Sequence, residues 1–297
     1  MALKNKFSLF DVINYTVLTL FTLACIFPFY YLFINTISNN DLSSRGLIMF
    51  YPQEIQFSNY KHVFQIPGLT LAAGVTVART VIGTALTVVA SGLLGYLFTK
   101  NEMWGRRFWY RFLVITMYFN AGLIPWYLTM RNLGLTNNFL AYIVPGIVSP
   151  FFIILVKTFV ESTPVALQES AQMDGAGYMT IFWKIVMPLI TPILATITIF
   201  SAVGQWNQFY DTLFLVTDSK LFTLQFILWR YMNEALSVAE IMKQSSGGAL
   251  RANLSIMPTP TSIRTTVSII VVIPILLVYP FFQRYFVKGI MIGAIKG

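Results

Sequence analysis

Long apolar runs alternate with short polar segments along this chain. Six windows contain no Asp, Glu, Lys or Arg: Val12–Phe33, Thr80–Thr99, Phe112–Met130, Leu133–Val156, Ile185–Tyr210 and Thr265–Gln283. A helix needs about 20 mostly apolar residues to cross a bilayer core about 30 Å thick. Helices are favoured because lipid offers no water to an unpaired backbone. We therefore predict an all-α integral membrane protein with six transmembrane helices in a single domain over residues 1–297, its core helices at about 80–283.

Composition and charge support this class. The chain is 56% hydrophobic and 10% charged, whereas soluble domains are about 25% charged. With the N-terminus inside, Lys and Arg are denser in the cytoplasmic segments than in the longer external loops, which include residues 217–264. Both termini are therefore expected in the cytoplasm. The first apolar run exceeds the roughly 7–15 residues of a signal-peptide core, so we expect it to be retained.

Two other classes find little support in the residues. Cys25 and His62 are the single cysteine and the single histidine, so no metal-ligand cluster is expected. The basic residues do not gather with aromatic residues on a soluble face, which argues against a nucleic-acid partner. The net charge of +9 is interpreted mainly as a signal of membrane topology.

A polar segment at residues 161–188 separates the fourth and fifth windows and is much longer than a simple connection requires. Thr163-Pro164 predicts a helix start, with a capping hydroxyl followed by proline at the first helical position. Gly175 and Gly177 predict a stop and a reversal, and a second short helix should follow over Tyr178–Met187. The segment, called the elbow below, is expected to lie at the cytoplasmic face.

The elbow also carries the clearest resemblance to a known family. Glu169-Ser-Ala171, Asp174-Gly-Ala176 and Ile185-Val-Met-Pro188 resemble the "EAA…G…I-LP" loop of permease subunits in binding-protein-dependent ABC importers, with Ser170 and Met187 departing from the pattern. Three further motifs are similar to the sugar-importing, MalG-like branch: Phe57-Ser-Asn-Tyr60, Trp206-Asn-Gln-Phe209 and the terminal Gly293-Ala-Ile-Lys-Gly297. Phe119-Asn-Ala-Gly-Leu-Ile-Pro125 looks most like permeases of the LplC and alginate-importer type, which carry complex or acidic oligosaccharides.

The resemblance implies a set of partners. The chain would form half of a heterodimer with a homologous second permease. Two ATPase subunits, expected as a homodimer, would lie below it, and an external solute-binding protein above it would deliver an oligosaccharide. ATP and Mg²⁺ would bind the ATPase subunits, since this chain has no G-x-x-x-x-G-K-[ST] phosphate loop. The cytoplasmic tail at residues 286–297 would reach between those subunits, unless it is simply a frayed terminus.

The resemblance also assigns ATPase coupling to residues of the elbow: Glu169, Ser170, Ala171, Asp174, Gly175, Ala176 and Pro188. Glu169 is expected opposite a basic group of the ATPase subunit as a charge-assisted contact; alternatively it only caps or solvates the elbow. Ala171 and Ala176 are expected to be small so that a partner can approach closely.

Polar and aromatic side chains at membrane depth mark the expected sugar path. The candidates are Tyr118 and Asn120 in the third window, Gln205, Trp206, Asn207 and Tyr210 in the fifth, and Arg79. Polar groups in lipid usually face protein or water, although these could instead join helices by hydrogen bonds. Arg79 is expected to reach the external interface with its guanidinium; alternatively it lines an entry that attracts uronate carboxylates.

Three rival functions were weighed. A secondary transporter usually carries Asp or Glu inside its spans, and the six windows hold none. A membrane enzyme would need a catalytic constellation, which the scattered carboxylates do not supply. A membrane scaffold without an ATPase stays open. We therefore expect a non-catalytic oligosaccharide permease, without a cofactor of its own, in the bacterial inner membrane.

Overall fold

The computed structural model describes residues 8–233 and 260–294, and these form helices and loops with no β-strand among them. The chain divides into two units. The first comprises Met1–Ile66 and Leu228–Ile273, and the second comprises Pro67–Ile227 and Pro274–Gly297. Helix α14 (Pro260–Ala294) contributes to both units.

The first unit contains α1 (Leu9–Thr36), α2 (Asn40–Ser44) and α3 (Ser58–Phe64). Most apolar side chains of α1 are exposed, as suits a helix surrounded by lipid or by a partner. Two residues of the Phe57-Ser-Asn-Tyr60 motif tie α3 to the end of α1: the Asn59 amide donates to the Thr36 carbonyl at 3.0 Å, and the Tyr60 and Thr36 hydroxyls lie 2.8 Å apart. The motif therefore has a structural role in the loop between α1 and α4.

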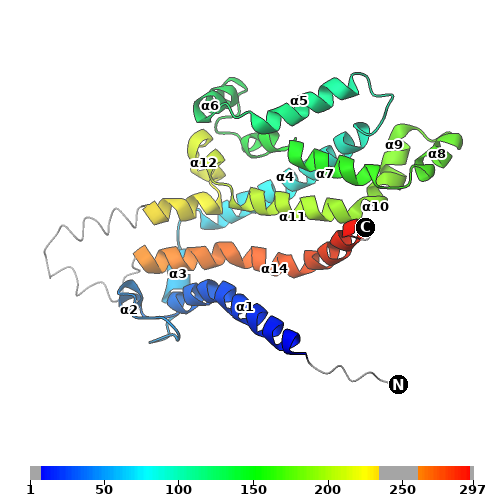
Figure 1. Ribbon diagram of the computed structural model, residues 1–297. Helices are drawn as coiled ribbons and strands as arrows, with labels where there is room; N and C mark the ends of the chain where they lie inside the picture. Colours follow the sequence, from blue (N-terminus) through cyan, green and yellow to red (C-terminus); the bar gives the residue numbers. More distant parts are fainter. Residues whose placement is uncertain (1–7, 234–259, 295–297) are drawn as a thin grey trace. The chain divides into compact units, whose positions relative to one another are not determined.

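The second unit is organised around α4 (Leu69–Leu97), which packs along α7 (Pro150–Glu161) and α11 (Thr191–Asn207). Figure 1 shows the three helices side by side. One core cluster includes Val75, Tyr142 and Leu215, and a second includes Tyr96, Val156 and Phe182. The remaining helical elements of this unit are α5 (Arg106–Tyr118), α6 (Leu123–Asn132), η1 (Phe139–Tyr142), η2 (Val144–Gly146), α8 (Ala166–Met173), α9 (Tyr178–Ile181), the π-helix η3 (Phe182–Val186), α10 (Met187–Leu189), α12 (Tyr210–Leu215) and η4 (Ser219–Leu221).

The apolar helices account for the predicted windows, but several are interrupted. Three helices are long and apolar enough to cross a membrane: Leu9–Thr36, Leu69–Leu97 and Thr261–Val278. Two bent pairs also qualify, Phe139–Gly146 with Pro150–Glu161 at 44° and Tyr178–Leu189 with Thr191–Asn207 at 81°. Together with the α5–α6 segment they correspond to the six windows of the sequence.

The third window, Phe112–Met130, is not the single helix that its hydropathy predicts. Helix α5 ends at Tyr118 and α6 begins at Leu123. The Asn120 side-chain oxygen accepts the Gly122 N–H at 2.9 Å, and Gly122 has a positive φ of 87°. A short amide side chain that bonds its own backbone, followed by a glycine in the left-handed region, favours a turn over a helix.

Gly95 sets the distance between α4 and α7. A Cβ atom at this position would lie 2.7 Å from Val156 Cβ and 3.1 Å from the Lys157 backbone nitrogen. Because neither atom belongs to a flexible side-chain end, we expect Gly95→Ala to lower the free energy of unfolding by about 1–3 kcal/mol. Thermal unfolding of the purified complex in detergent checks this. Gly74→Ala on the same helix is the control, since nothing lies within 4 Å of its added Cβ; equal unfolding midpoints for the two variants would contradict the prediction.

Candidate functional site

A cavity of about 830 Å³ opens in the second unit, where α4, α6, α7, α11 and α12 face one another. Its aromatic lining consists of Trp126, Tyr142, Phe152, Phe200, Tyr210 and Phe214. Its polar lining includes Thr87, Asn120, Ser149, Ser201, Gln205 and Gln208. Arg79 and Asp211 are its charged residues among those that the structure describes. The wall therefore combines flat apolar faces with many hydrogen-bonding groups.

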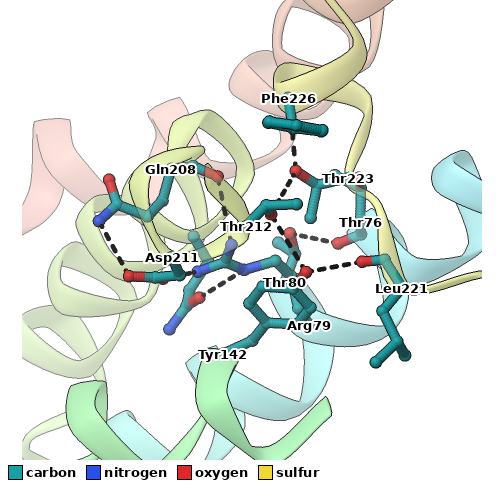
Figure 2. A network of polar contacts seen from close by, with 11 residues as sticks. Thr76, Arg79, Thr80, Tyr142, Gln208, Asp211, Thr212, Leu221, Thr223 and Phe226 are labelled. Atoms are coloured by element: carbon teal, nitrogen blue, oxygen red, sulfur yellow. Dashed lines mark hydrogen bonds and ion pairs between the residues drawn. The ribbon is translucent and has the colours of Figure 1, made fainter. Parts of the chain in front are cut away.

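The Arg79 guanidinium is the centre of the polar network beside this cavity (Figure 2). Its Nη2 lies 2.8 Å from Asp211 Oδ2, its Nε donates to Gln205 Oε1 at 3.1 Å, and its Nη1 donates to the Gln208 carbonyl at 3.2 Å. The Tyr142 ring lies under the guanidinium, 4.5 Å from Cζ to the ring centre. Arg79 is 1% exposed. The expectation that Arg79 reaches the external interface is therefore wrong, because its charge is neutralised inside the protein.

The network continues away from Arg79 through hydroxyl groups. The Tyr142 hydroxyl donates to the Leu221 carbonyl at 2.6 Å and accepts a bond of 3.1 Å from the Thr212 hydroxyl. The Thr76 hydroxyl accepts the Leu224 N–H at 2.9 Å. These bonds hold α4, η1, α12, η4 and the segment after η4 together around one buried charge. Figure 2 shows the bonds of Tyr142 with Leu221 and Thr212.

The structure divides the sequence-predicted path residues into two groups. Arg79, Asn120, Gln205 and Tyr210 line the cavity. The other three do not line it: Tyr118, Trp206 and Asn207. Tyr118 ends α5 with 85% of its surface exposed, Trp206 lines a separate apolar cavity of about 370 Å³, and the Asn207 amide donates to the Val203 carbonyl of its own helix at 3.0 Å.

Sequence reasoning missed several residues of the wall. Gln208 and Asp211 follow Gln205 at intervals of three residues, a spacing that could have placed them on one side of the chain. Asp211 is also the acidic residue nearest the end of its apolar window, as Arg79 is the basic residue nearest the start of another. Tyr142 gave no signal in the sequence, because an isolated tyrosine in an apolar run is ordinary.

The elbow contains a complete Schellman turn at the end of α8. Gly175 has a φ of 81°, its N–H donates to the Gln172 carbonyl, and the Ala176 N–H donates to the Ala171 carbonyl, both at 2.9 Å. This pattern satisfies the last carbonyls of a helix and favours glycine at the left-handed position. The predicted stop at Gly175 is confirmed. Gly177 follows in an extended conformation and precedes α9 as its N-cap residue.

One detail of the elbow differs from expectation, and a second was not predicted. The Thr163 hydroxyl donates to the Val160 carbonyl at 2.6 Å, so it closes the end of α7, and α8 begins at Ala166 without a side-chain cap. Ala171 and Ala176 pack against the protein's own core cluster around Tyr96. Their small size thus lets the elbow approach its own core, a role that the sequence did not suggest; that they also admit a partner stays a prediction.

The other predicted coupling residues lie on the surface: Glu169, Ser170, Asp174, Gly175 and Pro188. The Glu169 carboxylate has no hydrogen-bond or ion-pair partner among the residues that the structure describes. It is therefore available to a group on another molecule.

Lys100 connects the elbow to the end of α4, a contact that the sequence did not reveal. Its Nζ donates to Gln168 Oε1 at 2.6 Å, and lies 4.8 Å from the centre of the Tyr96 ring and 6.0 Å from that of Tyr178. Burial lowers the pKa of the Lys100 amino group, opposed by the nearby negative charge of Glu102. In the sequence Lys100 counted only as one more cytoplasmic charge.

Comparison with known proteins identifies this architecture. Residues 88–292, more than two thirds of the chain, match the family described as "Binding-protein-dependent transport system inner membrane component". The chain belongs to this family. The inner membrane component is 33% identical to Protein LplC of Bacillus subtilis (strain 168) over 289 residues, which cover 97% of this chain and 95% of LplC. It is 32% identical over 296 residues to YtcP of the same organism, the polygalacturonan/rhamnogalacturonan transport system permease protein, with 99% and 100% of the two chains covered.

A solved structure supports the same assignment. A chain in the crystal structure of a bacterial ABC transporter involved in the import of the acidic polysaccharide alginate superposes with a TM-score of 0.80 and 29% identity, covering 95% of this inner membrane component and 100% of that chain. The predicted helical permease fold and membership of the ABC importer permeases are thereby confirmed. The protein is a multi-pass transport component of the inner membrane.

The Arg79–Asp211 pair yields a stability prediction. Asp211→Leu leaves a buried guanidinium without its anion, so we expect the free energy of unfolding of this inner membrane component to fall by about 3–5 kcal/mol. The control is Glu161→Gln, which removes an i,i+4 pair of 2.7 Å to Lys157 at the surface and should cost about 0.5 kcal/mol or less. Unfolding in detergent measures both. Wild-type stability in Asp211→Leu would show that the neutral acceptors around Arg79 suffice.

Proposed function

We propose that this chain is one of two permease subunits of an ATP-driven importer of acidic oligosaccharides, and that its cavity is part of the translocation path. The observation that carries the proposal is the cavity wall of aromatic faces and uncharged hydrogen-bonding groups. Relatives along the whole chain point to the substrate class, since one is named for polygalacturonan and rhamnogalacturonan and a structural neighbour for alginate.

The aromatic side of the wall suits a sugar ring. The Tyr210 and Phe214 rings lie nearly parallel, at 7° with centres 6.1 Å apart, and Trp126 lines the same cavity. Such rings offer apolar faces to a pyranose, while a few placed polar groups fix its orientation. Asn120 and Gln205 are the proposed polar contacts among the residues predicted from sequence. For Tyr118, Trp206 and Asn207, which lie elsewhere, no contact with sugar is proposed.

The electrostatics of the wall suit an anionic sugar that must bind and then be released. Arg79 neutralises Asp211, so the pair gives the cavity neither a free cation to trap a uronate nor a free anion to repel it. Helix α6 begins at the cavity wall, where Gly122 and Leu123 line it. The positive end of a helix dipole favours a carboxylate without a formal charge.

The elbow is the proposed contact with the ATPase subunits, which would bind ATP and Mg²⁺. In addition to the unpaired Glu169, the elbow carries exposed apolar side chains that include Leu167, Met173 and Met179, with Met173 at 89%. Apolar side chains that stay exposed on a segment with an unpaired charge are typical of a protein-binding surface. A partner ATPase homodimer, the cytoplasmic termini and the insertion of residues 286–297 between its subunits belong to the same proposal; residues 295–297 lie outside the described part.

The proposal is tested by reconstitution. Wild-type chain, its second permease, the ATPase and the solute-binding protein loaded with trigalacturonate or an alginate trisaccharide are placed in proteoliposomes, with maltotriose as the neutral probe. We expect ATP-dependent uptake of an acidic trisaccharide. Uptake of maltotriose alone would refute the acidic substrate class, and failure to bind any ATPase would refute the importer.

Glu169→Lys tests the elbow. Replacing an unpaired surface carboxylate by a cation opposite a basic group should reduce co-purification of the ATPase and sugar-stimulated ATP hydrolysis by about tenfold, the loss of a charge-assisted contact. Glu161→Lys, a charge reversal at the first residue of the elbow and the end of α7, is the control and should assemble normally. If both variants behave alike, Glu169 has no specific role in docking.

Membrane topology is tested by labelling of single cysteines. Cys25 is the one native cysteine, so Cys25→Ser provides a background for Ser170→Cys in the elbow and Ser219→Cys near η4, both at exposed positions. A membrane-impermeant maleimide should label the Ser219→Cys protein in intact spheroplasts and the Ser170→Cys protein only after permeabilisation. The reverse pattern would place the elbow outside and refute the proposed orientation.

A further inference from the structure

We propose that Arg79 is a positioning residue that fixes the Gln205 carboxamide in a slot between Gly83 and Gly146, so that Gln205 Nε2 donates a hydrogen bond to an oxygen of the translocated sugar. The proposal rests on the proposed function and deepens it. It assigns to the cavity a specific donor and names the residues that orient it.

The orientation of the carboxamide follows from the chemistry of arginine. A guanidinium has donors and no acceptor. Because Arg79 Nε lies 3.1 Å from Gln205, the atom that faces it must be the carbonyl oxygen Oε1. The amide nitrogen Nε2 therefore faces away from Arg79. Within the described residues Nε2 makes no hydrogen bond, and Gln205 lines the cavity.

The slot is made by two glycines. A Cβ atom at Gly83 would lie 2.7 Å from Gln205 Nε2 and 2.9 Å from its Cδ, and a Cβ at Gly146 would lie 3.3 Å from Nε2. Gly83 lies inside α4, where glycine is unfavourable for the helix relative to alanine. The glycine is explained if the space that it leaves is needed for the Gln205 side chain.

The surroundings of Nε2 favour an oxygen ligand. Ser201, one helical turn before Gln205 on α11, lines the same cavity at 7% exposure, and its hydroxyl has no partner in the described part of the chain. The Asp211 carboxylate, the acidic group of the described cavity wall, is engaged by Arg79 and Gln208. Two unengaged polar groups on one face of α11 thus remain for a hydroxyl or carboxylate oxygen of a sugar.

Three variants separate the positioning role from a structural one. Gly83→Ala improves helix propensity yet displaces the carboxamide. Gln205→Glu keeps an acceptor for Arg79 but replaces the donor by a second acceptor. Arg79→Lys keeps a cation opposite Asp211 but loses the rigid fork that aligns Nε with Gln205. Gly74→Ala on α4 is the matched control, with nothing within 4 Å of the added Cβ.

The experiment compares uptake with ATP hydrolysis in proteoliposomes, using the binding protein loaded with trigalacturonate or an alginate trisaccharide. A sugar that loses one hydrogen bond escapes outward more often before the path turns inward. We therefore expect sugar taken up per ATP to fall about two- to tenfold in Gly83→Ala, Gln205→Glu and Arg79→Lys, the effect of one hydrogen bond. Stimulation of ATP hydrolysis by loaded binding protein should persist, and Gly83→Ala should unfold at the wild-type temperature or above.

Each other outcome counts against the proposal. Wild-type uptake per ATP in Gln205→Glu would show that the amide donates nothing to the sugar. Wild-type uptake per ATP in Gly83→Ala would show that the slot is not needed. The same result in Arg79→Lys would show that Arg79 has no positioning role. Equal losses of uptake, ATP hydrolysis and thermal stability would assign a structural role only. If the wild type takes up no acidic trisaccharide while Gly74→Ala and wild type assemble normally, the proposed function fails, and this inference with it.

Discussion

The buried cationic side chain of Arg79, on helix α4, is the constraint on which the rest of the second unit depends. A charge removed from water must be paired and fully hydrogen-bonded, or it destabilises the fold by several kcal/mol. The partner carboxylate, Asp211, lies 132 residues further along the chain. One contact also explains a local irregularity: α11 ends at Asn207, and the Gln208 carbonyl, in extended backbone, accepts a bond from the same guanidinium. The helix can break there because Arg79 satisfies a carbonyl that the break leaves free.

Helix breaks converge on the cavity in the same way. The α5–α6 break brings Asn120 and Gly122 into the wall, the bend before α7 brings Gly146 and Ser149, and the end of α11 brings Gln208. Non-helical backbone at membrane depth is tolerated where it is buried in protein or lines a water-filled cavity. Transport proteins commonly form their sites from discontinuous helices for this reason. The polar lining and the broken helices are therefore two aspects of one design, in which backbone released from helical bonding becomes available to solvent or substrate.

Sequence reasoning recovered what depends on local pattern. The length and hydropathy of the windows predicted the helical spans, and glycine at position 175 predicted the turn of the elbow, since both follow from nearest-neighbour geometry. It failed where partners are distant. The predicted spans end at charged residues, so Arg79 and Asp211 fall outside them. The sequence therefore does not reveal that these two residues pair with each other. Ala171 packs against the core, and Lys100 bonds Gln168, because the elbow folds back onto the end of α4. No local sequence pattern encodes this fold.

Helix α4 connects the elbow to the cavity. Lys100, just beyond its end, holds α8 of the elbow through Gln168, while Arg79 and Gly83 hold the cavity wall from within the same helix. Leu97 lies 18 residues beyond Arg79, a distance of about 27 Å at 1.5 Å per residue. Close packing of Gly95 against Val156 keeps α7 in register along this distance. In the proposed transport cycle, an ATPase displaces the elbow, and α4 transmits this displacement to the cavity wall as a stiff helix. The Arg79 hydrogen bonds at the cavity are directional, so such a displacement of α4 changes their length or angle.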